Sequence, residues 1–119
     1  MDTGRKITGG KYHANRKSRH YSKMNQERHA TLGETKRKSL KVTGGNMKRI
    51  VLRTNEANIL VKGKMQKVEI TNVEKTPQNI FYARQNRLVK GAIISTSAGK
   101  ARITNRPSQE GMVNAALIE

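Results

Sequence analysis

Apolar residues are distributed unevenly along the chain, and the pattern changes near residue 40. Up to Ser39 the only Val, Ile or Leu residues are Ile7 and Leu32. A segment of this composition cannot bury enough apolar surface to offset the entropy that it would lose on ordering. The sequence therefore predicts that residues 1–39 are an extension, disordered when the protein is free, and that residues 40–119 form the folded body.

From Leu40 onward, short clusters of β-branched residues are separated by Gly, Asn and Pro, a pattern typical of β-strands. Strict alternation of apolar and polar residues, which gives a strand one buried face, is seen at Val68/Ile70, Ala101/Ile103 and Val113/Ala115/Leu117. We predict strands over residues 40–43, 49–54, 57–61, 65–73, 88–96, 100–104 and 112–118.

The positions of Gly and Pro indicate how these strands are connected. Hairpin loops are predicted at Lys62-Gly63-Lys64 and at Ser97-Ala98-Gly99, where the final Gly suits a left-handed conformation. A helical turn is predicted over residues 77–85, because Thr76 can cap it and Pro77 is favoured at the first helical position. Together these elements predict a mainly β fold: a small antiparallel, closed or nearly closed β-barrel that carries a long, basic, irregular N-terminal extension.

Charge narrows the choice of partner. The chain holds 25 Lys and Arg against 8 Asp and Glu, a formal charge of +17, and residues 1–53 alone carry 15 basic and 3 acidic side chains. Such a field favours a polyanion, either nucleic acid or an anionic membrane. The longest apolar runs are only four residues, too short for a membrane-spanning helix or a secretory signal, so we expect a cytoplasmic protein that binds nucleic acid.

Catalytic and metal chemistry find little support in the sequence. There is no Cys, and His13, His20 and His29 stand at spacings that match no recognised zinc arrangement. Residues 40–119 contain no His, so Ser95 or Ser97 has no partner for a nucleophilic triad. We therefore expect neither an enzyme nor a cofactor. With one Phe and three Tyr, base stacking is also limited, and phosphate contact should dominate.

Two double glycines, Gly9-Gly10 and Gly44-Gly45, each lie close to basic residues. Glycine lets a backbone approach phosphate closely and present its N–H groups, but the spacing fits neither GxGxxG nor the Walker sequence. The alternative is a flexible tail at the first pair and a tight turn at the second, and the spacing leaves both interpretations open.

The basic residues before Ile50 are too irregularly spaced for one helical stripe, which favours an extended strand threading between RNA helices. A solvated charged surface and a DNA-compacting, chromatin-like protein are the alternatives. The predicted RNA-binding residues are Arg5, Lys6, Gly9, Gly10, Lys11, Arg16, Lys17, Arg19, Lys23, Lys36, Arg37, Lys38, Lys41, Gly44, Gly45, Asn46, Lys48 and Arg49.

Several ordered motifs resemble those of one family. Residues 5–10 (Arg-Lys-Ile-Thr-Gly-Gly) are followed after five residues by Arg16-Lys17, and Gly44-Gly45-Asn46 stands at the centre. The C-terminal part adds Pro77, Asn79, Tyr82-Ala83-Arg84, Lys90-Gly91-Ala92-Ile93-Ile94, Gly99-Lys100-Ala101, Arg106-Pro107, Gly111, Val113-Asn114-Ala115 and Leu117-Ile118. Over nearly the whole chain, these motifs resemble the short archaeal form of the small-subunit ribosomal protein family S8e.

The resemblance implies a β-barrel body held against small-subunit rRNA, with the N-terminal extension inserted into the RNA. It also implies a cytoplasmic, structural ribosomal protein that stabilises rRNA during assembly and translation, with neighbouring ribosomal proteins as further partners. Neither a membrane nor a small-molecule substrate is implied. The chain departs from the family pattern at Ser18, His20, Ser22, Lys23 and Met24, which predicts a diverged archaeal member.

Overall fold

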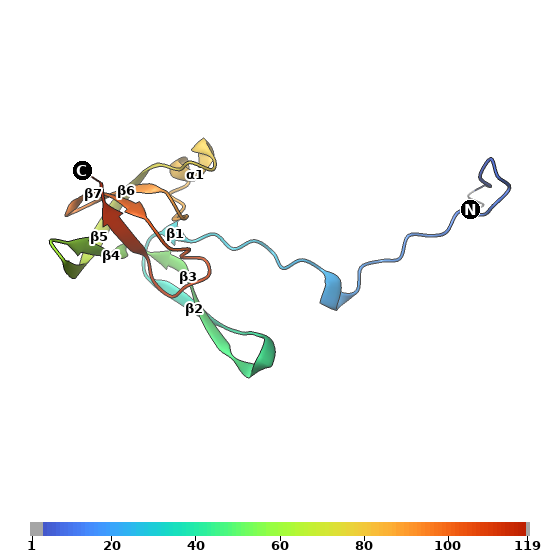
Figure 1. Cartoon of the computed structure of the whole chain (residues 1–119), viewed down its shortest axis with the longest axis horizontal. Coiled ribbons are helices and arrows are strands. Elements are labelled where there is room, and N and C mark those ends of the chain that lie inside the picture. Colours follow the sequence, from blue (N-terminus) through green and yellow to red (C-terminus); the bar gives the residue numbers. More distant parts are fainter. Residues whose placement is uncertain (1–3, 119) are drawn as a thin grey trace.

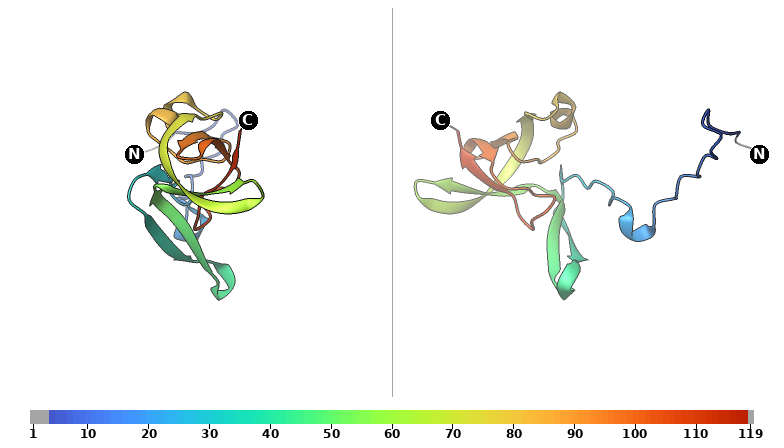
Figure 2. Two further views of the ribbon diagram at one scale, coloured as in Figure 1. Left: turned by 90° about the vertical axis from the view of Figure 1, so that its left-hand side faces the viewer. Right: turned by 45° about the vertical axis from the view of Figure 1, so that its right-hand side comes forward.

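The computed structural model describes residues 4–118, which form a barrel, a projecting three-stranded sheet and an N-terminal arm of residues 4–29 (Figure 1). The arm leads away from the folded part, so the molecule measures 73 × 36 × 24 Å along its principal axes. Figure 2 shows that the arm and the projecting sheet leave the barrel in different directions. The protein therefore offers two separate extensions to a partner.

Five strands close the barrel in the order β4 (Glu56–Val61), β5 (Lys64–Lys75), β6 (Ile93–Thr96), β7 (Gly99–Ile103) and β8 (Asn114–Leu117). The mainly β fold and the closed barrel predicted from the sequence are confirmed. One pairing differs from the all-antiparallel prediction, because β8 runs parallel to β4 where the barrel closes. Closure satisfies the edges that an open sheet of this size would expose.

The barrel core comes from the predicted alternation. Val68, Ile70, Ala101, Ile103 and Ala115 are all buried, while the residues between them on the same strands face outward. The buried side chains Ile59, Leu88, Ile94 and Val113 complete the packing. The interior of the barrel is thus filled by aliphatic side chains. The barrel therefore acts as a rigid support for the extensions.

Two hairpin turns of the barrel are tighter than predicted. Lys62 and Gly63 both have positive φ (48° and 78°), as in the two-residue turn that suits hairpin twist, and Lys64 already pairs with Val61. At the second turn, Gly99 pairs with Thr96 and belongs to β7. The predicted loops of three residues were each one residue too long, because a two-residue turn follows the twist of the strands more closely.

The helix α1 (Ile80–Arg84) begins three residues later than predicted. Its cap is Asn79, whose side chain accepts a hydrogen bond from the Phe81 amide at 2.9 Å, whereas the hydroxyl of the predicted cap Thr76 is buried and donates to the Asn79 carbonyl. Pro77 therefore precedes the helix.

Within residues 4–118, no helix is long and apolar enough to span a membrane.

The predicted strand over 88–96 exists only in its second half. Leu88 donates its amide to Ala30 at 2.8 Å, outside the barrel ladder, and Gly91 has φ +83°, which breaks an extended run. Residues 88–92 therefore form a loop leading into β6. The last predicted strand, 112–118, is likewise shorter, since β8 covers Asn114–Leu117.

The projecting sheet contains β1 (Thr31–Leu32), β2 (Lys36–Lys41) and β3 (Met47–Thr54) in the order β1-β3-β2. We call residues 36–54, which comprise β2, β3 and their connection, the hairpin. The predicted strand over 40–43 is confirmed only at residues 40–41 and its bounds were wrong, because β2 starts at Lys36 and ends at Lys41; β1 was not predicted. Neither segment has an apolar pattern of its own, and both are strands because they pair with β3.

Candidate nucleic-acid interface

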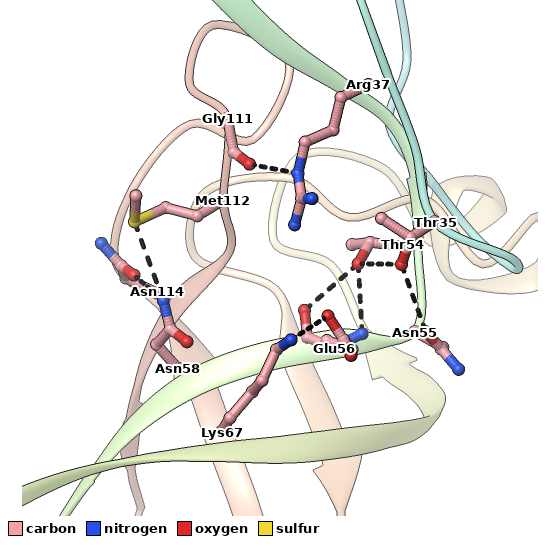
Figure 3. Close-up of polar contacts among 10 residues, drawn as sticks. All are labelled: Thr35, Arg37, Thr54, Asn55, Glu56, Asn58, Lys67, Gly111, Met112 and Asn114. Atoms are coloured by element: carbon pink, nitrogen blue, oxygen red, sulfur yellow. Dashed lines mark hydrogen bonds and ion pairs between the residues drawn. The ribbon is translucent and has the colours of Figure 1, made fainter.

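Hydrogen bonds that the hairpin donates to the loop before β8 fix the hairpin to the barrel; Figure 3 shows the one from Arg37. The Arg37 Nε donates to the Gly111 carbonyl at 2.8 Å, and the Val51 amide donates to the carbonyls of Pro107 and Glu110 at 3.1 Å each. The Lys48 Nζ also donates to the side-chain oxygen of Gln109. Both strands of the hairpin are therefore held against this loop.

A polar corner at Thr54 turns the chain from the hairpin into the barrel. Thr54 is 2% exposed, and its hydroxyl accepts from the Glu56 amide at 3.2 Å and lies 3.4 Å from the Thr35 hydroxyl (Figure 3). Because the buried hydroxyl is satisfied by these partners, the corner has a defined geometry. It sets the direction in which the hairpin leaves the barrel.

We expect the Arg37 contact to stabilise this orientation. Arg37→Lys keeps the charge but removes the Nε donor, so the Val51 amide should exchange its hydrogen roughly two- to fivefold faster, the scale of one exposed hydrogen bond. Hydrogen exchange followed by NMR measures this. Lys38→Ala, which removes a charge from the same strand, should leave the exchange of Val51 unchanged, and equal rates in Arg37→Lys and the wild type would exclude an anchoring role.

The outer half of the hairpin carries basic residues on both faces. Lys41 pairs with Met47 and Ser39 with Arg49 on one face, while Leu40 pairs with Lys48 on the other. Every residue from Lys41 to Met47 is exposed. The hairpin therefore presents Lys41 and Arg49 to solvent on one face, while Lys48 on the other face is half-buried and bonded to Gln109.

The second double glycine forms the tip of the hairpin. Gly44 and Gly45 have φ of 83° and 78°, and the Val42 amide closes the turn by donating to the Asn46 carbonyl at 2.9 Å. The tight turn, one of the two interpretations of this motif, is thus present. Apart from its two chain neighbours, no residue has an atom within 4 Å of a Cβ built on Gly45, so the backbone of the tip is open to a partner.

The first double glycine closes a turn near the start of the arm. Arg5 pairs with Lys11, the Lys6 amide donates to the Gly10 carbonyl at 2.9 Å, and Gly9 has φ +81°. The Arg5 guanidinium donates to the Gly9 carbonyl at 3.0 Å. This turn sets basic side chains around an exposed backbone.

The rest of the arm is extended. One 3-10 turn, η1 (His20–Ser22), interrupts it, and all residues from 4 to 28 are exposed. The predicted contact residues Arg16, Lys17, Arg19 and Lys23 lie on this part and face solvent. The arm itself gives them no packed environment.

Two acidic side chains of the barrel pair with lysines, whereas the extensions carry most of the positive charge. Within residues 4–118 the Lys and Arg ion pairs are Lys67–Glu56 at 2.7 Å and Lys100–Glu74 at 2.9 Å, both on the barrel. Hydrogen bonds from Ser95, which has the larger effect, and from Lys100 lower the pKa of Glu74. None of the predicted contact cations has a carboxylate within 4 Å in this part of the chain, so their field remains available to a polyanion.

The root of the arm is anchored to the barrel. The Leu88 amide donates to the Ala30 carbonyl at 2.8 Å, and the His29 ring lies 6.1 Å from that of Tyr82, over which the Arg87 guanidinium stacks at 4.5 Å. Arg87, and Arg53 opposite Lys36, are basic residues of this region that the sequence did not single out. No local sequence pattern marks these two residues, because each is brought to the root of the arm by pairing with a residue distant in the sequence.

A closed barrel that carries two extensions rich in basic residues is an arrangement that favours a polyanionic partner. In the same described residues, no three His, Cys, Asp or Glu side chains gather closely enough to hold a metal ion. The model of the family Ribosomal protein S8e matches residues 2–118. The chain belongs to this family.

Named relatives agree with the family. A protein called small ribosomal subunit protein eS8 from Methanocorpusculum labreanum is 45% identical, the match covering 97% of this chain and 94% of the relative. Proteins of the same name from Halorubrum lacusprofundi and Methanococcus aeolicus are each 44% identical, over 97% and 96% of this chain and 94% and 91% of theirs. The similarity thus includes both extensions as well as the barrel.

Proposed function

We propose that this protein is a structural constituent of the small ribosomal subunit in which the arm and the hairpin bind rRNA. The observation that carries the proposal is the division of charge: residues 1–53 carry 15 basic and 3 acidic side chains, whereas residues 54–119 carry 10 and 5. The predicted contact cations of the extensions have no carboxylate within 4 Å in residues 4–118. The names of the relatives place those proteins in the small subunit. The site of action is then the cytoplasmic ribosome.

The proposed mechanism is phosphate neutralisation at points where rRNA helices approach one another. The exposed arm threads between helices and becomes ordered as its charge is compensated, as basic segments do on RNA. The hairpin, held to the barrel by Arg37 and Val51, adds a second set of cations in a fixed direction. Reducing repulsion between phosphates lets the helices pack, which stabilises the subunit during assembly and translation.

The open backbone at the hairpin tip suits close approach of a phosphate, and Gly45 tests this. Asn tolerates positive φ, so Gly45→Asn should keep the turn while its side chain blocks the approach. We expect affinity for small-subunit rRNA to fall about fivefold, the scale of one lost hydrogen bond. Filter binding measures the affinity, and NMR of the Val42 amide reports whether the turn is intact.

Gly45→Val serves as the companion variant, because a β-branched residue is strained at φ 78° and should distort the turn as well. If Gly45→Asn binds as tightly as the wild type while Gly45→Val does not, the glycine matters for turn geometry alone. Close approach of phosphate to the tip would then be excluded.

A lysate fractionated on a sucrose gradient tests the proposed function as a whole. The protein should migrate with the small subunit and remain there through a high-salt wash, because an assembled component is held by many contacts at once. Migration with genomic DNA would favour the chromatin-like alternative. Competition with duplex DNA separates the two further, since phosphate contact alone does not distinguish RNA from DNA, whereas recognition of RNA shape and 2′-hydroxyls does.

A further inference from the structure

A cleft of about 730 Å³ opens at the root of the arm, between the hairpin and the barrel. One wall is the arm itself, residues 24–30; a second is the hairpin, at residues 40–42, 48 and 50; and the third is formed by residues 88–89 and 108–109. Its volume falls in the range of sites that enclose small organic ligands. Apart from Lys41 and Lys48 at its rim, the phosphate contacts proposed above make no use of this cleft.

The floor of the cleft is apolar and fixed. Ala30, Ile50 and Leu88 are each 1% exposed, and the Leu88 amide is bonded to the Ala30 carbonyl, so the floor is part of the packed core. Leu40 and Val89 extend the apolar surface up the walls. A flat apolar group that enters the cleft would be removed from water on one face.

The rim is polar and basic. Lys41 and Lys48 stand on the hairpin side, and Arg28 on the arm side. Ser108, Gln109, Asn25 and Gln26 add hydrogen-bonding groups, and because Lys48 holds the side-chain oxygen of Gln109, the amide donor of Gln109 stays available. Glu27 is the one carboxylate among the lining residues, and it lies 3.7 Å from the His29 ring nitrogen.

We propose that this cleft receives one unpaired nucleotide of the bound RNA, with the base against Leu40 and Val89, which are half-buried above the packed floor, and the phosphate at the basic rim. An apolar floor, amide groups at the edge and a cationic entrance match the three parts of a nucleotide. The inference rests on the proposed function, since the arm that forms one wall is also the segment that would lie along the RNA. An RNA strand following the arm toward the barrel would reach the cleft directly.

Filling the cleft without removing a cation tests the inference. Ser108→Trp would occupy the space, and Ala98→Trp, on the exposed turn between β6 and β7, is the matched control. We expect Ser108→Trp to lower affinity for a small-subunit rRNA transcript about tenfold, the scale of one lost base contact. The salt dependence of binding and the affinity for duplex DNA should be unchanged, and Ala98→Trp should behave as the wild type.

Equal rRNA affinity in Ser108→Trp and the wild type, with the salt dependence intact, would overturn the cleft proposal and leave the proposed function standing. If the wild type shows no preference for rRNA over duplex DNA, the proposed function fails and the cleft proposal fails with it. A second measurement needs no variant: ultraviolet crosslinking of the wild-type protein to rRNA should yield modified peptides containing residues 88–89 or 108–109. Crosslinks confined to the outer arm and the hairpin tip would count against the cleft.

Discussion

Deletion of residues 2–28 is expected to lower the affinity for small-subunit rRNA by two orders of magnitude or more at physiological salt. The deleted segment contains eight Lys and Arg residues, all exposed. If each of them neutralises a phosphate, the slope of log affinity against log salt should become shallower by about six, at roughly 0.7 to 0.9 per contact. Titrations at several salt concentrations measure both quantities, and thermal unfolding should show that the barrel is retained.

Charge removal elsewhere provides the control for this deletion. Lys17→Ala with Lys23→Ala removes two charges from the arm, and Lys62→Ala with Lys64→Ala removes two from the far end of the barrel. We expect the arm pair to reduce the slope by about two contacts and the barrel pair to change it little. An arm deletion that binds rRNA as tightly as the full chain would contradict the proposed function of the arm.

Ile59→Ala is expected to reduce the free energy of unfolding by about 2–5 kcal/mol, the largest effect of any single substitution considered for this chain. Ile59 is 0% exposed, and its removal leaves a cavity inside the barrel next to strands that cannot move without breaking closure. Urea unfolding followed by circular dichroism measures the change. The neighbouring Leu60, 52% exposed on the outer face, is the matched control.

Leu60→Ala should cost under about 1 kcal/mol, because the side chain is already largely in water. Equal losses for the two variants would mean that the alternation along β4 does not separate inside from outside. Saturating rRNA should partly restore the midpoint of Ile59→Ala, since a ligand that binds only the folded state stabilises it. If rRNA raises the unfolding midpoint of neither Ile59→Ala nor the wild type, the result would instead point to weak RNA binding.

The barrel could be predicted from the sequence because the patterns that specify its strands and turns lie within short segments of the chain. Alternation at Val68/Ile70 and Ala101/Ile103 specifies which face of each strand is buried, and glycines mark the corners. The parallel pairing of β8 with β4 carries no such mark, since residues 58 and 114 meet only after the chain has closed on itself. Periodicity therefore gives the strands and the fold class but not the direction of the closing pair.

The candidate interface was predictable in composition and not in geometry. Lys36, Arg37 and Lys38 were grouped with the disordered extension because charge dominates their segment, yet they lie on a strand that β3 holds in place. Arg37 shows the consequence: its guanidinium contacts Gly111, 74 residues away, so it has a structural contact as well as a charge. The cleft also escaped prediction, because its three walls come from distant parts of the chain.

The parallel pairing of β4 with β8, which closes the barrel, also determines which parts of the protein can fold before its synthesis is finished. β4 pairs with β8, the last strand of the described chain, and the hairpin is attached to the barrel through the carbonyls of Pro107, Glu110 and Gly111, which precede β8. The arm depends on neither and emerges from the translating ribosome first. We therefore expect the barrel to close, and the hairpin to become fixed to it, only after β8 has been synthesised, when the arm is already exposed to solvent.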